Sequence, residues 1–170
     1  MNKNIHFIIT GGTIDSVFSA EKDTVVVNDS SVIANYLETA IKPHIEVTSE
    51  ILTLKDSREI TDNIRHEILS SIEKAKTNAI VITHGTYTMP ETARFLEKNI
   101  ENLDKTVILT GSMYPLKGFS DSDAPYNLGY AISAAQLLEP GVYLAMNSHI
   151  FKPNEVHKSV EKARFVETKS

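Results

Sequence analysis

Small hydroxyl side chains stand directly after several short apolar runs of the sequence, usually beside a glycine or an acid. The segments are Thr10-Gly11-Gly12-Thr13, Asp56-Ser57, Thr83-His84-Gly85-Thr86, Thr110-Gly111-Ser112 and Asn147-Ser148. Serine or threonine at any single turn most often bonds the local backbone or caps a helix. The repetition of the pattern favours a polar pocket, and hydroxyls gathered with helix N-termini suit a small ligand that carries a carboxylate.

Other chemistries fit these segments poorly. Residues 10–14 lack the third glycine of a dinucleotide-binding G-x-G-x-x-G, and Gly85-Thr86 lacks the lysine of a P-loop. The histidines are scattered without H-x-x-x-H or H-E-x-x-H spacing and cysteine is absent, so no metal site is predicted. His84 is interpreted as a structural or hydrogen-bonding residue, and Asp121-Ser122-Asp123 resembles only the start of a calcium loop.

The elements that must hold these turns alternate between strand and helix. Continuous apolar runs predict buried strands at residues 5–9, 45–54, 79–82, 106–109 and 142–145. Helical spacing of apolar residues predicts helices in residues 32–40, 64–75 and 125–138, and the capping-box spacing of residues 88–91 predicts a further helix to about Lys98. This alternation predicts an α/β fold with a doubly wound, mainly parallel sheet flanked by helices, whose ligands bind at the carboxyl ends of the strands.

Composition excludes several classes of protein. A chain of 170 residues, 41% of them hydrophobic, can bury one ordinary core, so residues 1–170 are expected to form a single domain. The net charge of −5 gives no electrostatic footprint for a nucleic acid, and the absence of an 18-residue apolar run argues against a membrane span. The apolar run at residues 5–9 is too short for a signal-peptide core, and the lack of cysteine fits a cytoplasmic protein.

Two of the hydroxyl segments carry a specific resemblance. Residues 9–14, ITGGTI, and residues 81–93, VITHGTYTMPETA, resemble in order the first and second signatures of the bacterial-type L-asparaginase family. Shorter matches follow at residues 110–115, 122–128, 141–147 and 156–158. The resemblance covers nearly the whole chain but only the family's amino-terminal domain, so the family's second, smaller domain is expected to be absent.

The resemblance implies an amidohydrolase that needs no cofactor. Such an enzyme converts the side-chain amide of Asn, or a related small amide, into an acid and ammonia through an acyl-enzyme. Thr13 matches the family's threonine nucleophile, and Thr86 together with Lys158 matches its proton-handling group. A lysine serves as a base only where desolvation or a positive neighbour depresses its pKa.

The resemblance also implies the residues that bind the substrate. Ser57 matches a serine that binds the α-carboxylate, and its neighbours Asp56 and Arg58 are assigned to the same task. Gly12 and Gly85, which precede the two signature threonines, are assigned to substrate binding as well. A homodimer or higher homo-oligomer is expected from the family.

Three departures from the family pattern bear on the function. Tyr87 stands where the family has an aspartate that binds the substrate's α-ammonium, and Asp56 and Asp123 are candidate replacements. Residues 15–28, the family's mobile loop, contain Phe18 but none of the tyrosine that activates the nucleophile. The third departure is the expected absence of the domain that closes the site.

Two interpretations of Tyr87 follow, and they lead to two functional hypotheses. Tyr87 either supplies the missing phenol beside Thr86, or fills space in a catalytically weakened site. The first hypothesis is therefore an amidohydrolase. The second is a ligand-binding or regulatory module of the same fold that has lost turnover.

Overall fold

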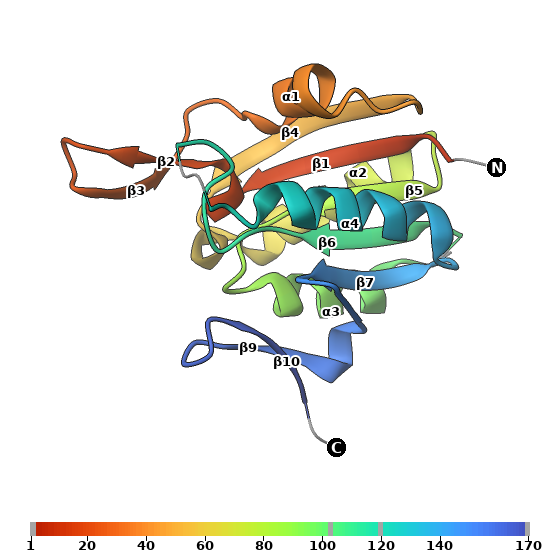
Figure 1. The fold of residues 1–170 in the computed structure, drawn as a ribbon. Helices are drawn as coiled ribbons and strands as arrows, with labels where there is room; N and C mark the ends of the chain where they lie inside the picture. Colours follow the sequence, from red (N-terminus) through yellow and green to blue (C-terminus); the bar gives the residue numbers. More distant parts are fainter. Residues whose placement is uncertain (1–2, 102–103, 119–120, 169–170) are drawn as a thin grey trace.

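The central sheet has six strands in the order β4-β1-β5-β6-β7-β8 within the described residues of this computed structural model, which are 3–101, 104–118 and 121–168 (Figure 1). The strands are β4 (Val47–Lys55), β1 (Ile5–Gly11), β5 (Ala79–Thr83), β6 (Thr106–Thr110), β7 (Gly141–Met146) and β8 (His149–Phe151). All neighbours pair in parallel except β8, which runs antiparallel to β7. The predicted mainly parallel sheet is confirmed.

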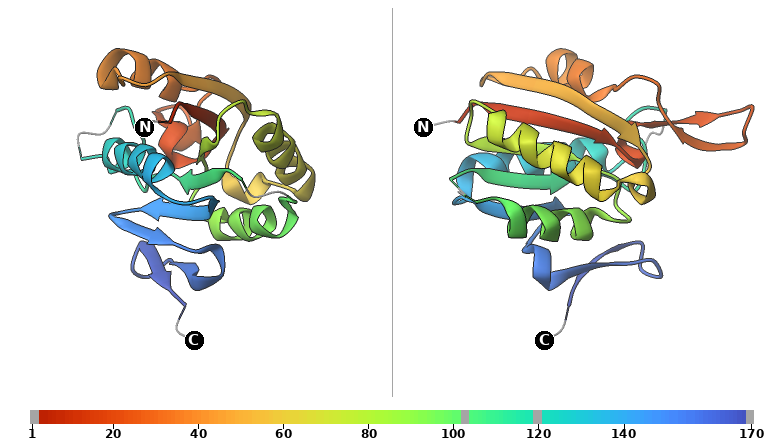
Figure 2. Two further views of the ribbon diagram at one scale, coloured as in Figure 1. Left: turned by 90° about the vertical axis from the view of Figure 1, so that its right-hand side faces the viewer. Right: turned by 180° about the vertical axis from the view of Figure 1, so that it is seen from behind.

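Helices cover both faces of this sheet. The helices α2 (Asp62–Lys74) and α3 (Met89–Asn99) lie on one face, whereas α1 (Ile33–Tyr36) and α4 (Ala124–Leu137) lie on the other (Figure 2). Alternate strand residues serve the two cores: Ile8 and Ile80 pack on the α2–α3 side, and Phe7 and Val81 on the α1–α4 side. The inner strands β1, β5, β6 and β7 are therefore buried on both faces, which explains their apolar runs, whereas the edge strand β4 keeps exposed residues.

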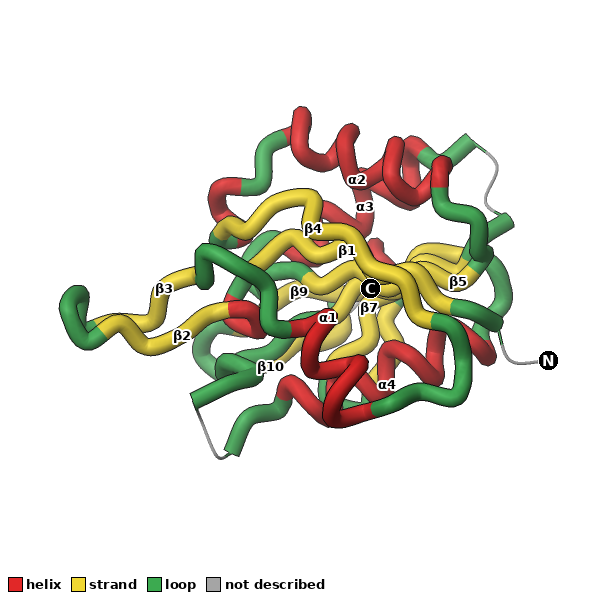
Figure 3. Tube along the Cα trace, turned by 90° about the horizontal axis from the view of Figure 1, so that it is seen from above, coloured by secondary structure: helices red, strands yellow, loops and turns green. Residues whose placement is uncertain are grey.

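Two β-hairpins outside the sheet were not predicted. The first joins β2 (Ser16–Ser19) to β3 (Thr24–Val27), and the second joins β9 (Val156–Ser159) to β10 (Arg164–Glu167). The β2–β3 hairpin extends well beyond the carboxyl end of β1 (Figures 1 and 3). The segment expected as a loop at residues 15–28 is thus largely a hairpin, because its short β-branched run at 24–27 pairs with residues 16–19.

The predicted capping box at the start of α3 is wrong. Thr88 precedes the helix but makes no side-chain cap. Its hydroxyl donates instead to the carbonyl oxygen of Ser57 at 2.6 Å, so a tertiary acceptor has replaced the local one. Thr88 therefore ties the start of α3 to the turn that follows β4.

In the part of the chain that the structure describes, none of the helices combines the length and the apolarity needed to traverse a bilayer.

Candidate active site

A cavity of about 170 Å³ lies where β1, β4 and β5 end. Its lining consists of Thr13, Asp56, Ser57, Arg58, Gly85, Thr86, Tyr87 and Lys158. Gly12 lines an adjoining cavity of about 410 Å³, which shares Thr13, Asp56 and Arg58 with the first. The structure therefore brings together the residues that the resemblance assigned to catalysis and substrate binding, together with Tyr87, whereas their individual roles remain predictions.

The first signature turns sharply after β1 on two glycines. Gly11 and Gly12 have φ angles of 92° and 84°, in the left-handed region that favours glycine. A Cβ on Gly12 would collide with the backbone of Gly85, so the two signature loops meet without an intervening side chain. The chain then enters a 3-10 turn at Thr13–Asp15, which presents half-buried Thr13 at the mouth of both cavities.

The second signature is positioned by a buried hydrogen-bond chain through His84. Nδ1 of His84 lies 2.8 Å from the carbonyl oxygen of Gly85, which can only accept, so Nδ1 carries the proton. Nε2 then accepts from the hydroxyl of Thr92 at 3.0 Å, and the same oxygen accepts from Nε of Arg65 at 3.2 Å. Burial lowers the pKa of His84 to about 4, so the ring is neutral and its predicted structural role is confirmed.

Thr92 and Arg65 were not found by sequence reasoning. Both come from helices, α3 and α2, and neither stands next to a strand end. The only signal was the position of Thr92 inside the second signature, seven residues after Gly85.

Lys158 reaches the second signature from the β9–β10 hairpin. Its Nζ donates to Oγ1 of Thr86 at 2.6 Å, and the Thr86 side chain is buried. Burial lowers the pKa of Lys158; the carboxylate of Asp56 acts against this shift and the guanidinium of Arg58 adds to it. An amine with a lowered pKa on a hydroxyl is an arrangement for proton transfer.

The turn after β4 contributes a buried serine between two charged residues. Asp56 caps this turn, and its Oδ1 accepts from the backbone N–H of Arg58 at 2.9 Å. The Arg58 guanidinium donates to both oxygens of the same carboxylate, with Nε 2.8 Å from Oδ1 and Nη2 3.1 Å from Oδ2. This pairing keeps the pKa of Asp56 below its usual range. Ser57 is almost fully buried and lines the cavity, and its hydroxyl oxygen accepts from the backbone N–H of Thr88 at 3.3 Å.

Tyr87 covers the cavity from its solvent side. The residue is 53% exposed, and the centroid of its ring lies 5.6 Å from Cζ of Arg58 and 5.9 Å from Nζ of Lys158. Both separations fall within the range of cation–π attraction. Among the described residues its hydroxyl has no hydrogen bond, so a direct contact with Thr13 is not part of this structure.

Asp123 does not replace the family's missing acid. Its carboxylate accepts from the backbone N–H groups of Met113 and Tyr114 and from Nδ2 of Asn127, each at 3.0 Å. It therefore holds the loop after β6 and lies outside the lining of both cavities. The expectation for Asp123 was wrong because a short acid before a helix satisfied nearby backbone donors instead.

Several of the strand-end hydroxyls also serve the backbone. Thr10 donates to the carbonyl oxygen of Thr83 at 2.8 Å, and Thr110 donates to that of Ala145 at 2.9 Å. Of the strand-end hydroxyl residues in the described ranges, Thr13, Ser57 and Thr86 line the 170 Å³ cavity.

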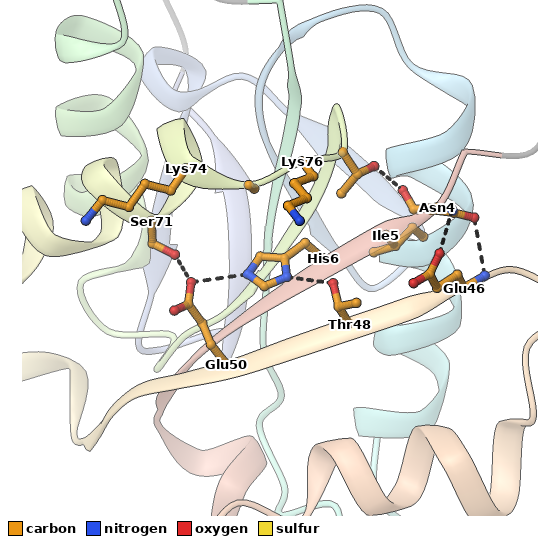
Figure 4. A pocket seen from close by; sticks show the side chains of 11 residues that line it. Asn4, Ile5, His6, Glu46, Thr48, Glu50, Ser71, Lys74 and Lys76 are labelled. Atoms are coloured by element: carbon orange, nitrogen blue, oxygen red, sulfur yellow. Dashed lines mark hydrogen bonds and ion pairs between the residues drawn. The ribbon is translucent and has the colours of Figure 1, made fainter.

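A larger cavity, of about 430 Å³, lies at the opposite end of β1 and β4 (Figure 4). Its polar groups bond one another: His6 lies 3.1 Å from Oε1 of Glu50 and 2.8 Å from Oγ1 of Thr48, and Ser71 donates to Glu50. None of the predicted residues lines it. Within residues 3–101, 104–118 and 121–168, no three His, Asp or Glu side chains are grouped as metal ligands would be.

The fold and this site define an α/β protein with a hydroxyl–lysine pocket at the carboxyl ends of a parallel sheet. Residues 4–165 match the family model described as Asparaginase, N-terminal. The chain belongs to the asparaginase family.

Named relatives and solved structures agree with this assignment. The glutaminase-asparaginase of Acinetobacter glutaminasificans is 32% identical over 92% of this chain and 50% of its own length, and L-asparaginase 2 of Escherichia coli is 33% identical over 92% and 46%. The structure of L-asparaginase I from Vibrio cholerae superposes with a TM-score of 0.85 at 31% identity, covering 98% of this chain and 52% of that one. The chain therefore spans about half the length of the relatives it matches.

Proposed function

We propose that the protein is an amidohydrolase that hydrolyses the side-chain amide of Asn, or a related small amide, to the acid and ammonia. The observation that carries the proposal is the 2.6 Å contact between Nζ of Lys158 and Oγ1 of Thr86, in a cavity that also contains Thr13. The relatives of this chain include proteins named as L-asparaginases, which supports the same reaction class.

In the proposed reaction, Oγ1 of Thr13 attacks the amide carbon and forms a tetrahedral adduct. The proton of Thr13 passes through Thr86 to the neutral amine of Lys158, which returns it to the leaving nitrogen. Ammonia departs as the carbon–nitrogen bond breaks, and an ester to Thr13 remains. A water molecule then attacks this ester and passes its proton through Thr86 to Lys158. Lys158 returns that proton to Oγ1 of Thr13 as the acyl–oxygen bond breaks, which releases the acid and restores the enzyme.

The proposal depends on Lys158 being neutral for part of the time at working pH. Burial lowers its pKa, and Arg58 lowers it further, so a larger fraction of this amine is unprotonated than of a solvated lysine. Tyr87 is proposed to support the nucleophile with its phenol, since it lines the cavity together with Thr13.

Measurement of ammonia release tests the reaction. Wild type, Thr13→Ala and Lys158→Met are compared across asparagine, glutamine and blocked amides, and both variants are expected to lose activity by at least a hundredfold. Release that persists in Thr13→Ala rules out this mechanism. Unchanged activity in Tyr87→Phe excludes the role of the phenol, and the absence of turnover on every amide would favour the ligand-binding module.

The assembly and the location are parts of the same proposal. We propose that residues 1–170 act as one domain and that the chain forms a homo-oligomer. The support for self-association is α4, which contains no charged residue and leaves Tyr126 and Leu137 more than half exposed. A cytoplasmic location is supported by the absence of cysteine and is tested by cell fractionation.

A further inference from the structure

The charges that line the site are unbalanced toward the positive. Among the described residues that line the two cavities, Asp56 is the one acid, whereas Arg58 is a permanent cation and Lys158 is a second cation whenever its amine is protonated. Both oxygens of Asp56 are already bonded by Arg58, at 2.8 Å and 3.1 Å, and Oδ1 also receives a backbone N–H. Asp56 is thus already paired with a cation of the protein, and none of the other described lining residues offers a carboxylate to an ammonium group of a ligand.

Tyr87 strengthens this imbalance. Its ring lies within 6 Å of both cations, with the Arg58 and Lys158 groups 5.6 Å and 5.9 Å from the centroid. The attraction that an aromatic ring offers to a cation is thus already used by the protein. A ligand ammonium placed beside Tyr87 would meet Arg58 and protonated Lys158 as like charges, and the acid nearby, Asp56, is already paired with Arg58.

Anionic groups find the opposite environment. The side chain of Arg58 is 68% exposed beside the cavity, and Ser57 lines the same cavity. A guanidinium and a hydroxyl are suitable donors for a carboxylate. The adjoining cavity of about 410 Å³, partly lined by Val25, Val27 and Pro115, offers room for an uncharged substituent.

We propose that the substrate of this site is a small amide that carries a carboxylate and no free ammonium group, such as succinamate or an N-acylated asparagine. This inference rests on the proposed amide hydrolysis. The same carbon–nitrogen bond of the amide is hydrolysed to the acid and ammonia, and the substrate differs from asparagine only in lacking the charged ammonium group next to Tyr87. Free asparagine is then a poor substrate because its α-ammonium finds no unpaired acid among the lining residues.

Competition among matched amides tests the substrate class. Ammonia release is measured with succinamate, N-acetylasparagine and asparagine, and kcat/KM is expected to be at least tenfold higher for one or both of the first two. If succinamate alone is preferred to asparagine, the substrate lacks the amino group altogether. If N-acetylasparagine alone is preferred, the substrate carries an acylated amino group. A higher kcat/KM for asparagine overturns the inference and leaves the proposed function intact.

Binding of the product acids distinguishes failure of the proposed amide hydrolysis from failure of the inferred substrate class. If no amide is hydrolysed, the proposed function fails, and calorimetry with succinate and aspartate still tests the charge argument. Tighter binding of succinate supports it, whereas equal or tighter binding of aspartate overturns it.

A pair of variants that differ only in the charge of the side chain at position 87 tests the electrostatic cause of the substrate preference. Tyr87→Asp introduces an unpaired carboxylate and is expected to move the asparagine-to-succinamate ratio of kcat/KM, or of the affinities of the acids, at least tenfold toward the ammonium compound. Tyr87→Asn removes the same ring with an uncharged side chain of the same size, and the ratio is expected to stay within twofold of wild type. Equal shifts in the two variants would overturn the electrostatic explanation, with circular dichroism verifying that both fold.

Discussion

Lys158 sits between two opposite charges that act on its pKa in opposite directions. The carboxylate of Asp56 stabilises the protonated amine, and the guanidinium of Arg58 destabilises it. The two groups are bonded to each other, so neither can be removed without changing the field that the other exerts.

This arrangement predicts shifts of opposite sign in the pH dependence of activity. Asp56→Asn removes the attraction and lowers the pKa of Lys158, so the rising limb of kcat/KM should move to lower pH. Arg58→Gln removes the repulsion and leaves Asp56 free to attract the amine, so the limb should move to higher pH. Profiles of ammonia release against pH measure both shifts; movement in the same direction would contradict the role of Lys158 as the base.

His84 predicts a pH dependence of stability. Its pKa of about 4 in the folded protein lies below its unfolded value, so the unfolded state binds the proton more readily as the pH falls from 6.5 toward 4. Stability should therefore fall in that window by about 3 kcal/mol from this group alone. At neutral pH, His84→Ala should lower the free energy of unfolding by about 2–4 kcal/mol, through lost packing and an unpaired Gly85 carbonyl.

Urea unfolding at several pH values checks this prediction. The difference in the free energy of unfolding between wild type and His84→Ala should shrink as the pH falls toward 4. His44→Ala is the matched control. His44 is exposed, so its removal should alter neither the free energy of unfolding at neutral pH nor the dependence of that free energy on pH. A difference that stays constant with pH would mean that the ring has the same pKa in the folded and in the unfolded protein.

At the scale of elements, the two signature turns are held against each other by glycine backbone. Gly12→Ala would place a methyl group against Gly85 at a φ angle of 84°, so the turn must move. We expect a loss of more than about 1 kcal/mol in the free energy of unfolding and a larger loss of ammonia release, because Thr13 moves with the turn.

Gly129 provides the matched control for this substitution. It lies in α4 with open space around the position of a Cβ. Gly129→Ala should therefore raise the free energy of unfolding by about 0.5–1 kcal/mol, and leave ammonia release unchanged. A Gly12→Ala variant as stable as wild type would contradict the close approach of the two turns.

The sequence predicted those elements whose burial leaves a clear pattern. The apolar runs of β1, β5 and β6 and the spacing of α2 and α4 predicted elements within a few residues of their observed bounds. The strand ends predicted where the site lies, because ligands gather at the carboxyl edge of such sheets. The hairpins were not predicted because four-residue strands are too short to show a hydrophobic period. The hydrogen bond from Thr88 to Ser57 was not predicted because it joins residues 31 positions apart in the sequence.

At the scale of the whole molecule, α4 presents an outer face without charge. Leu137 is 78% exposed and Tyr126 is 55% exposed, although the Tyr126 hydroxyl is bonded to that of Ser148 at 2.6 Å. If it mediates the proposed self-association, Leu137→Glu should shift the protein toward monomer in sedimentation experiments. Ile41→Glu, on an exposed apolar side chain outside α4, should not. A monomeric wild type would remove the basis of the prediction.

Lys158 belongs to a hairpin that is not a member of the central sheet. The strands β9 and β10 pair only with each other among the described strands, and the segment is attached to α3 by bonds from Arg94 to the carbonyl oxygens of Pro153 and Val156 and by buried Phe165. Peripheral segments of this kind open at lower free energy than a sheet does. On heating, the protein should therefore stop working several degrees before it melts, and cooling from that intermediate range should restore it.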